Sequence, residues 1–203
     1  MYSIDPATMS ERENYKFLTG TIVPRPIAFV TTVGTDGTIN AAPFSFFNIV
    51  SSNPPLVSLS VQRKNGKQKD TARNIVDSGE YVIHIVDESN VDEVNKTAAS
   101  LPAYESELDL TNFTMITSSV VGTPAVQEAK VRMECRLEKA IPLGGDNKDG
   151  CDLLIGNIVA YHIDENLYDS KGHINQEELA AVSRLAGNQY AKMGEFFSIE
   201  RPE

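Results

Sequence analysis

PRPIAFVTTVGTDGTINAAPFSFFNIVSSNPPLVSLSV, residues 24–61, is the segment that determines the fold. Residues 27–33 are almost all apolar or β-branched, and Asp36-Gly37 is a hairpin-turn signal. Residues 57–61 alternate apolar side chains with serines, as in a half-buried strand. These patterns predict three strands that are joined by turns rich in hydroxyl and amide side chains.

A basic loop follows the last of these strands. Residues 63–73 carry five cationic side chains and one carboxylate, a local balance of 5 − 1 = +4 in a chain of formal net charge −10. Helical spacing follows and stops before Gly79, and Asp70 is the expected N-cap of this helix. A helix N-terminus beside Lys69 favours the binding of a phosphate group. The cationic residues of the loop are Arg63, Lys64, Lys67, Lys69 and Arg73.

The remaining chain predicts more strands, with short helices and loops between them. Ser10 is expected to cap a short helix over residues 9–18 that packs as a flap. Asn90 and Glu93 have capping-box spacing within a helical excursion over residues 87–113. Further strands are expected at 80–86, 131–137 and 152–163, a hairpin loop at 144–150, and a short helix at 177–182.

Three of these strands contain residues whose role can be interpreted from the pattern. His84 lies in a strand that is apolar on both faces, so we interpret it as a core histidine rather than a catalytic one. In the strand 131–137, Cys135 is expected to point inward and Glu134 outward into solvent. Gly156 predicts a bulge or a close approach of another group to the backbone.

Composition limits the class of protein. A chain of 203 residues with 41% hydrophobic content can form one well-packed core, so a single domain over 1–203 is expected. It has neither an apolar run of about 20 residues nor a basic-then-apolar N-terminus, which favours a soluble cytoplasmic protein without membrane contact. The net charge of −10 argues against binding nucleic acid.

Several kinds of catalytic site lack their sequence signals. Cys135 and Cys151 are 16 residues apart, with no CxxC pattern and no histidine cluster, so neither a disulfide framework nor a metal site is indicated. The sequence contains no GxSxG, P-loop or GxGxxG pattern. Chemistry by a bound cofactor, which the protein positions, is therefore favoured.

At this point the sequence resembles the flavin-reductase-like proteins, which bind FMN on a split β-barrel. The resemblance covers most of the chain, and it depends on several short motifs that occur in this order and at these spacings. The motifs are Pro24-Arg25-Pro26, Thr35-Asp36-Gly37, residues 40–48 (NAAPFSFFN), Ser51-Ser52 before Pro54-Pro55, Lys69-Asp70-Thr71 with Asn74-Ile75, and residues 184–190 (RLAGNQY).

The resemblance implies a fold, a cofactor site and an assembly. The fold would be mainly β with flanking helices, a Greek-key antiparallel split barrel. FMN would lie along the backbone from Phe44 to Asn48, with Tyr190 adding aromatic surface, and NAD(P)H is a possible electron donor. The chain would form a homodimer with the flavin near the interface, and a partner monooxygenase is possible. The implied cofactor-binding residues are Arg25, Ser45, Phe46, Phe47, Asn48, Ser51, Ser52, Lys69, Asp70, Thr71, Asn74 and Tyr190.

One position departs from part of the family. Cys151 stands where many members that use reduced nicotinamide have the histidine of a Gly-Asp-His triplet. Cys151 is either a flavin-adjacent thiol or a small residue that starts a strand. Three hypotheses therefore remain: an FMN-dependent oxidoreductase of the flavin reductase type, an FMN-binding electron carrier or sensor without NAD(P)H turnover, and a dimeric binding module without flavin.

Overall fold

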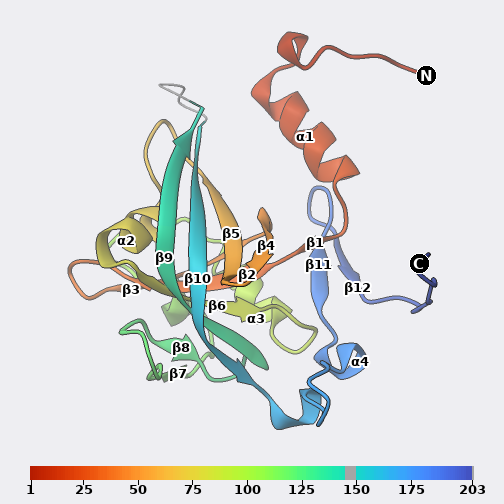
Figure 1. Ribbon diagram of the computed structural model, residues 1–203. Helices are drawn as coiled ribbons and strands as arrows, with labels where there is room; N and C mark the ends of the chain where they lie inside the picture. Colours follow the sequence, from red (N-terminus) through yellow and green to blue (C-terminus); the bar gives the residue numbers. More distant parts are fainter. Residues whose placement is uncertain (145–149, 203) are drawn as a thin grey trace.

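The computed structural model, which describes residues 1–144 and 150–202, is dominated by one antiparallel sheet (Figure 1). Its seven strands lie in the order β3-β2-β6-β9-β10-β5-β4. The two edge strands β3 and β4 are separated in sequence only by Ser45 and Phe46, so the sheet must curl until its edges approach each other. The strands are β2 (Ala28–Val33), β3 (Ile39–Phe44), β4 (Phe47–Ser52), β5 (Pro55–Gln62), β6 (Glu80–Ile85), β9 (Val131–Leu143) and β10 (Cys151–Ile163).

The three strands expected in the opening segment are confirmed as β2, β3 and β5, but the expectation of only turns between the last two was wrong, because Phe47–Ser52 forms the additional strand β4. The turn between β2 and β3 is closed by Gly34, whose N–H donates to the carbonyl of Thr38 at 2.8 Å, and Gly37 adopts a positive φ of 86°. Along β5, Val57, Leu59 and Val61 are buried, as the alternation with serine predicts. These residues pack inside the curled sheet against β6 and β10 and form the main core.

Close approach at Gly156 is also confirmed. The register of β10 against β9 shifts between Ile155 and Gly156. A Cβ atom on Gly156 would lie 1.7 Å from the hydroxyl oxygen of Tyr81, because the tyrosine ring packs directly against the backbone at this position. Only glycine leaves room for this buried tyrosine ring at the centre of the barrel.

Helix α2 (Asp70–Ser78) covers one end of the barrel. It buries Ala72 and Ile75, and Gly79 ends it in the left-handed conformation with φ 73°, as expected. The predicted N-cap was wrong. Lys69 is the N-cap without a side-chain cap, because Asp70 lies inside the first turn and binds Arg73 at 2.5 Å instead.

The expected helical excursion over 87–113 contains only two short elements, α3 (Val91–Lys96) and the 3₁₀ turn η2 (Glu107–Leu110). Asn90 is the N-cap of α3, but the capping box was wrong: the Asn90 side chain accepts from the N–H of Asp87. Glu93 binds Lys96 and the N–H of Asn112. Both side chains therefore stabilise loops through hydrogen bonds. After this region, the short strands β7 (Met115–Ile116) and β8 (Ala125–Val126) pair with each other.

The expectation that Glu134 faces solvent was wrong. Its carboxylate is fully buried and accepts hydrogen bonds from the N–H groups of Ser119, Val120 and Val121 at 2.7, 2.6 and 2.9 Å, and from Nε2 of His162 at 2.6 Å. Burial alone would raise the pKa of this carboxyl, but the four donors outweigh it and lower the pKa to about 2. Cys135, by contrast, is buried as expected.

An N-terminal and a C-terminal arm leave the barrel together (Figure 1). The helix expected after Ser10 is confirmed as α1 (Glu11–Thr21), with a capping box between Ser10 and Glu13. It does not pack as a flap on this chain, because Thr19 is its only buried residue. The arms meet in a small sheet in the order β1-β11-β12. Their other elements are the 3₁₀ turns η1 (Pro6–Thr8) and η3 (Glu165–Leu167), β1 (Arg25–Pro26), α4 (Gln176–Leu179), β11 (Val182–Arg184) and β12 (Tyr190–Lys192).

Two further expectations concern loops and membranes. The hairpin expected at 144–150 is consistent with the pairing of Leu143 and Cys151, but residues 145–149 lie outside the described part of the chain. The helix expected at 177–182 is the single turn α4. Within residues 1–144 and 150–202, none of the helices has the length and apolar character that crossing a bilayer requires.

Candidate functional site

A cavity of about 540 Å³ opens where the end of β3, the basic loop and the start of α2 meet. One wall is apolar and includes Pro43, Phe44 and Leu101. Most of the polar lining comes from residues 64–65 and 67–71, which belong to the basic loop and the first turn of α2. This size and this division into an apolar wall and a few polar groups are typical of sites for cofactors and small ligands.

The floor of the cavity is held by a buried hydrogen-bond network. Asn40 donates through Nδ2 to both carboxylate oxygens of Glu107, at 3.0 and 2.9 Å, and the N–H of Ala41 donates to the same carboxylate at 3.1 Å. The hydroxyl of Thr71 donates to Oδ1 of Asn40 at 2.8 Å. Burial raises the pKa of Glu107, and the charge of Asp70 raises it further. The hydrogen bonds that Glu107 accepts from Ala41 and Asn40 act in the opposite direction and lower this pKa. The network ties β3, α2 and η2 together.

The cationic loop is only partly available to a ligand. Arg63 binds Asp152 through two donors, at 3.1 and 2.7 Å, and Arg73 binds Asp70. The other three cations, Lys64, Lys67 and Lys69, all line the cavity. The partial desolvation of Lys69 lowers its pKa, and the charge of Lys64 lowers it further. The positive charge that sequence analysis assigned to the whole loop is therefore concentrated on three lysines.

The structure brings three of the expected cofactor residues together. Lys69, Asp70 and Thr71 line the cavity beside Phe44. Thr71 donates its hydroxyl proton to Asn40, so only its oxygen lone pairs remain for a ligand. The other expected residues do not line this cavity; they are Arg25, Ser45, Phe46, Phe47, Asn48, Ser51, Ser52, Asn74 and Tyr190.

Those other residues have roles within the described chain. Asn48 accepts from the N–H of Ile49 at 2.8 Å on the exposed edge strand β4, and Ser51 accepts from the N–H of Asn53 at 3.2 Å. Asn74 is buried on the inner face of α2, where it donates to Thr32 at 3.1 Å. Phe47 packs against the main core, and the carbonyl of Phe46 accepts from the N–H of Ser60.

Arg25 and Tyr190 lie in the arms. Arg25 is buried, and its guanidinium donates to the carbonyls of Thr19, Ile22 and Leu185. Tyr190 lies in a second cavity, of about 410 Å³, that is separate from the first. The guanidinium carbon of Arg184 stacks over its ring, 4.4 Å from the centroid, and its hydroxyl donates to Asn95 at 2.9 Å.

Sequence reasoning missed the cavity-lining residues that are distant in sequence from the basic loop and α2. Asn40 lies within a quoted motif but was not selected, and Glu107 was assigned to a helical excursion. Residues 97–101, which follow α3, also line the cavity. No local periodicity marks these positions, since the chain brings them together over 67 residues between Asn40 and Glu107.

His84 and the cysteines add no reactive group to this cavity. The N–H of Val126 donates to Nε2 of His84 at 2.9 Å, so Nδ1 must carry the proton that it donates to the carbonyl of Phe29 at 3.0 Å. Burial and the charge of Arg132 lower the pKa of His84 to about 4, which confirms a neutral core histidine. Cys151 is the half-buried first residue of β10. Within 1–144 and 150–202, no group of three His, Cys, Asp or Glu could hold a metal ion.

Comparisons with known proteins agree with this architecture. The model of the flavin reductase like domain matches residues 19–178. The Bacillus subtilis protein YwrF is 52% identical over the full length of both chains. The crystal structure of nitrilotriacetate monooxygenase component B from Bacillus cereus superposes with a TM-score of 0.95, at 55% identity over 98% of each chain.

A more distant structure supports the fold alone. The Shewanella frigidimarina protein with a split barrel domain superposes with a TM-score of 0.83 and 21% identity, over 97% of this chain and 96% of its own. The curled antiparallel sheet of the present chain is the same split barrel. The expected mainly-β split-barrel fold is therefore confirmed.

Proposed function

Because this chain belongs to the flavin-reductase-like family, we propose that it is an oxidoreductase that binds FMN and passes electrons from NAD(P)H to flavin or another acceptor. The observation that carries the proposal is the cavity in which Lys69, the first turn of α2 and an apolar wall face one space. FMN has the matching parts, a terminal phosphate and a flat, largely apolar ring system.

The residues of the cavity fit a phosphate at the start of α2. The first N–H groups of a helix have no partners within the helix, and they carry partial positive charge. Lys69 is the N-cap residue, so its ammonium group and these N–H groups can act on one anion. Partial desolvation lowers the pKa of Lys69, and the negative charge of a phosphate beside it would act in the opposite direction and raise that pKa.

Other residues of the cavity would orient the rest of the cofactor. Phe44 and Leu101 offer apolar surface, and the Asn40–Glu107 pair holds the end of β3 in place against α2. Asp70 is paired with Arg73, which reduces the repulsion between its carboxylate and a phosphate. A bound FMN would supply the redox chemistry, by taking electrons from a donor and releasing them to an acceptor.

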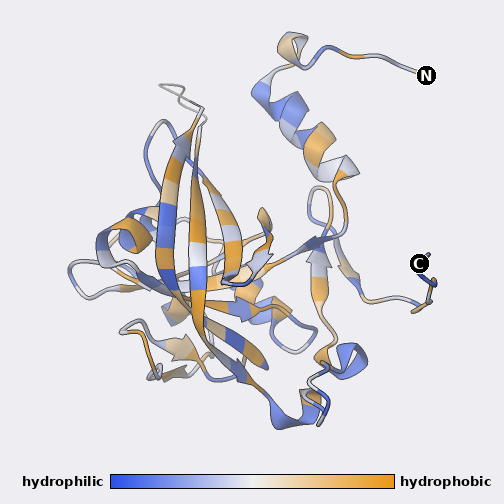
Figure 2. Cartoon of the chain, viewed as in Figure 1, coloured by the Kyte–Doolittle hydropathy of each residue, from blue (hydrophilic) through white to orange (hydrophobic). Residues whose placement is uncertain are grey.

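We further propose that the protein is a homodimer whose second subunit completes the flavin site. The chain has exposed apolar side chains on its two arms and on the edge strand β4. Figure 2 shows hydrophobic residues on α1 and β4. Phe17 of α1 is 56% exposed and Ile49 of β4 is 77% exposed. Exposed apolar side chains on an edge strand and on a projecting helix are typical of interfaces. A second copy is the simplest occupant, because closed two-fold dimers are the commonest oligomers.

The dimer would also explain why expected residues such as Asn48 and Ser51 lie outside the cavity of a single chain. These residues belong to the exposed edge strand β4, beside Ile49. A second subunit that covers β4 would enclose them in the completed site. A partner monooxygenase is a possible acceptor of the electrons, since the similar Bacillus cereus protein is a component of a monooxygenase.

The runner-up function is an FMN-binding carrier or sensor that has no turnover with NAD(P)H. The observation that favours it is Cys151, which stands where many relatives that use nicotinamide have histidine and which begins β10 beside Gln62. Anaerobic mixing with NADH or NADPH separates the two functions: loss of flavin absorbance at a useful rate supports the reductase, and persistent absorbance supports the carrier.

The visible spectrum of the purified protein tests flavin binding itself. We expect absorbance typical of a flavin, or uptake of added FMN with quenching of its fluorescence. A colourless preparation that takes up neither FMN nor FAD would reject both functions and leave a binding module without flavin. Sedimentation of the flavin-loaded protein tests the assembly, and flavin bound to a species of monomer mass would contradict the proposed dimer.

A further inference from the structure

The main cavity is lined by more cationic side chains than one flavin phosphate requires. Lys64, Lys67 and Lys69 all line it. Within residues 1–144 and 150–202, none of these three ammonium groups has a carboxylate oxygen within 4.0 Å. The nearby acids have other partners, since Asp70 binds Arg73 and Glu107 binds Asn40. In a chain of net charge −10, this group of lysines is unusual.

Two of the lysines face each other across a tight turn. The N–H of Lys64 donates to the carbonyl of Lys67 at 3.0 Å, and the N–H of Lys67 donates back at 3.1 Å. Asn65 and Gly66 between them have positive φ angles of 54° and 76°, as a two-residue hairpin turn requires. Side chains of directly opposed residues lie on the same face, about 5.5 Å apart at Cα. Like charges in such a pair destabilise each other, and a shared anion would relieve this repulsion.

The third lysine, Lys69, lies outside this turn, at the start of α2. Lys69 caps α2, where the helix N–H groups can bind the same phosphate. One flavin phosphate, with a charge of about −2, is matched by Lys69 and the helix N-terminus. Lys64 and Lys67 then remain as a second pair of cations in the same cavity.

We propose that Lys64 and Lys67 bind a second phosphate group, which an adenine dinucleotide carries into the cavity. The inference rests on the proposed function, because the cavity is the proposed flavin site. Two ligands of a flavin oxidoreductase bring such a group: NADPH through its 2′-phosphate, and FAD through the second phosphate of its diphosphate. NADH lacks the 2′-phosphate and FMN lacks the second phosphate, so each provides a matched comparison.

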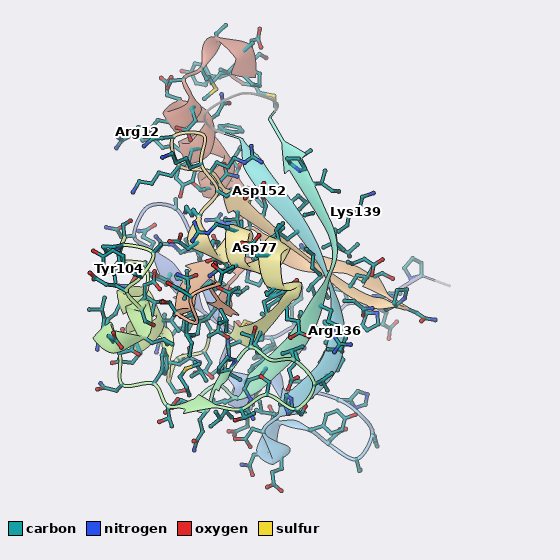
Figure 3. The ribbon with its side chains drawn as sticks, turned by 90° about the vertical axis from the view of Figure 1, so that its left-hand side faces the viewer. Arg12, Asp77, Tyr104, Arg136, Lys139 and Asp152 are labelled. Atoms are coloured by element: carbon teal, nitrogen blue, oxygen red, sulfur yellow. The ribbon has the colours of Figure 1, made fainter. Side chains whose placement is uncertain are left out.

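The test uses the full-length holoprotein and the double variant Lys64→Ala/Lys67→Ala. Lys139→Ala is the matched control, because Lys139 is an exposed lysine on β9, which Figure 3 shows on the opposite side of the molecule from Tyr104 and the cavity-lining segment before it. For each protein, the dissociation constants of FMN and FAD are measured by fluorescence titration. The kcat/KM values for NADPH and NADH are measured with saturating FMN.

We expect the FMN dissociation constant of the double variant to stay within about twofold of the unaltered protein, and one dinucleotide to be affected about tenfold or more. A fall in kcat/KM for NADPH with NADH unchanged identifies the 2′-phosphate. A rise in the FAD dissociation constant with both nicotinamides unchanged identifies the diphosphate. The control should show neither effect.

Two results would overturn the inference. One is a rise in the FMN dissociation constant as large as any other change, which would assign the hairpin to the flavin's own phosphate. The other is the absence of any change. If the unaltered protein binds no flavin, the proposed function fails separately, and titrations of adenosine 2′,5′-bisphosphate and of ADP, each against AMP, still decide the hairpin's role. Equal binding of all three nucleotides would then reject it.

Discussion

Replacing Glu134 with glutamine should remove a part of the stability that depends on pH. The carboxylate is buried and accepts from three backbone N–H groups and from His162. Its folded pKa of about 2, against an ordinary value of 4.5, corresponds to a contribution of about 3 kcal/mol above pH 5. Because the folded pKa is the lower one, this contribution is present above pH 4.5 and is lost as the pH falls towards 2.

The expected loss can be measured between pH 5 and pH 3. The contribution of Glu134 falls to roughly half of its value in this interval, whereas a glutamine cannot titrate. Urea denaturation at both pH values gives the free energy of unfolding of each protein at fixed concentration.

The difference in unfolding free energy between the unaltered protein and Glu134→Gln should therefore shrink by about 2 kcal/mol from pH 5 to pH 3. Glu138→Gln is the matched control, because Glu138 is an exposed glutamate on the same strand. The control should differ from the unaltered protein by less than about 0.5 kcal/mol at pH 5. A difference for Glu134→Gln that stays constant from pH 5 to pH 3 would refute the reasoning.

Three other changes test the core, the flavin site and the dimer. Gly156→Ala should lower the free energy of unfolding by about 1–3 kcal/mol in urea denaturation, since its Cβ would meet the Tyr81 hydroxyl oxygen at 1.7 Å, and Tyr81→Phe should recover part of this loss. Lys69→Ala should raise the FMN dissociation constant about tenfold in fluorescence titration and Lys64→Ala much less, while equal small effects would contradict the phosphate placement. Phe17→Glu should shift sedimentation towards the monomer, and an unchanged dimer would exclude α1 from the interface.

The fold was predictable because its evidence is local in sequence. Alternation along residues 57–61, the Asp36-Gly37 turn and Gly79 after α2 each specify a conformation within a few residues. Glu134 was mispredicted because alternation assumes that one face of a strand meets solvent. Here the segment around Val120 folds over that face, and this coverage depends on residues 14 positions away in sequence.

The site was predictable only where its residues are contiguous. Lys69, Asp70 and Thr71 enter the cavity together because they form the start of one helix. Asn40 and Glu107 meet through a hydrogen bond across 67 residues, which no periodicity reveals. The misplaced N-cap has a local origin instead: Asp70 has the right residue type, but the guanidinium of Arg73, three residues away, binds its carboxylate.

Arg25 shows how the two arms can keep a fixed direction without a core of their own. Helix α1 buries only Thr19, so apolar packing within this chain cannot orient it. The buried guanidinium of Arg25 instead binds the carbonyls of Thr19 and Ile22 at the end of α1, and the carbonyl of Leu185 beside β11. Hydrogen bonds from a charged donor are directional and strong, so they hold both arms in one geometry while the apolar face of α1 stays uncovered. Polar contacts at the base of α1 thus fix the helix while its apolar residues stay exposed, which is the arrangement that the proposed homodimer requires.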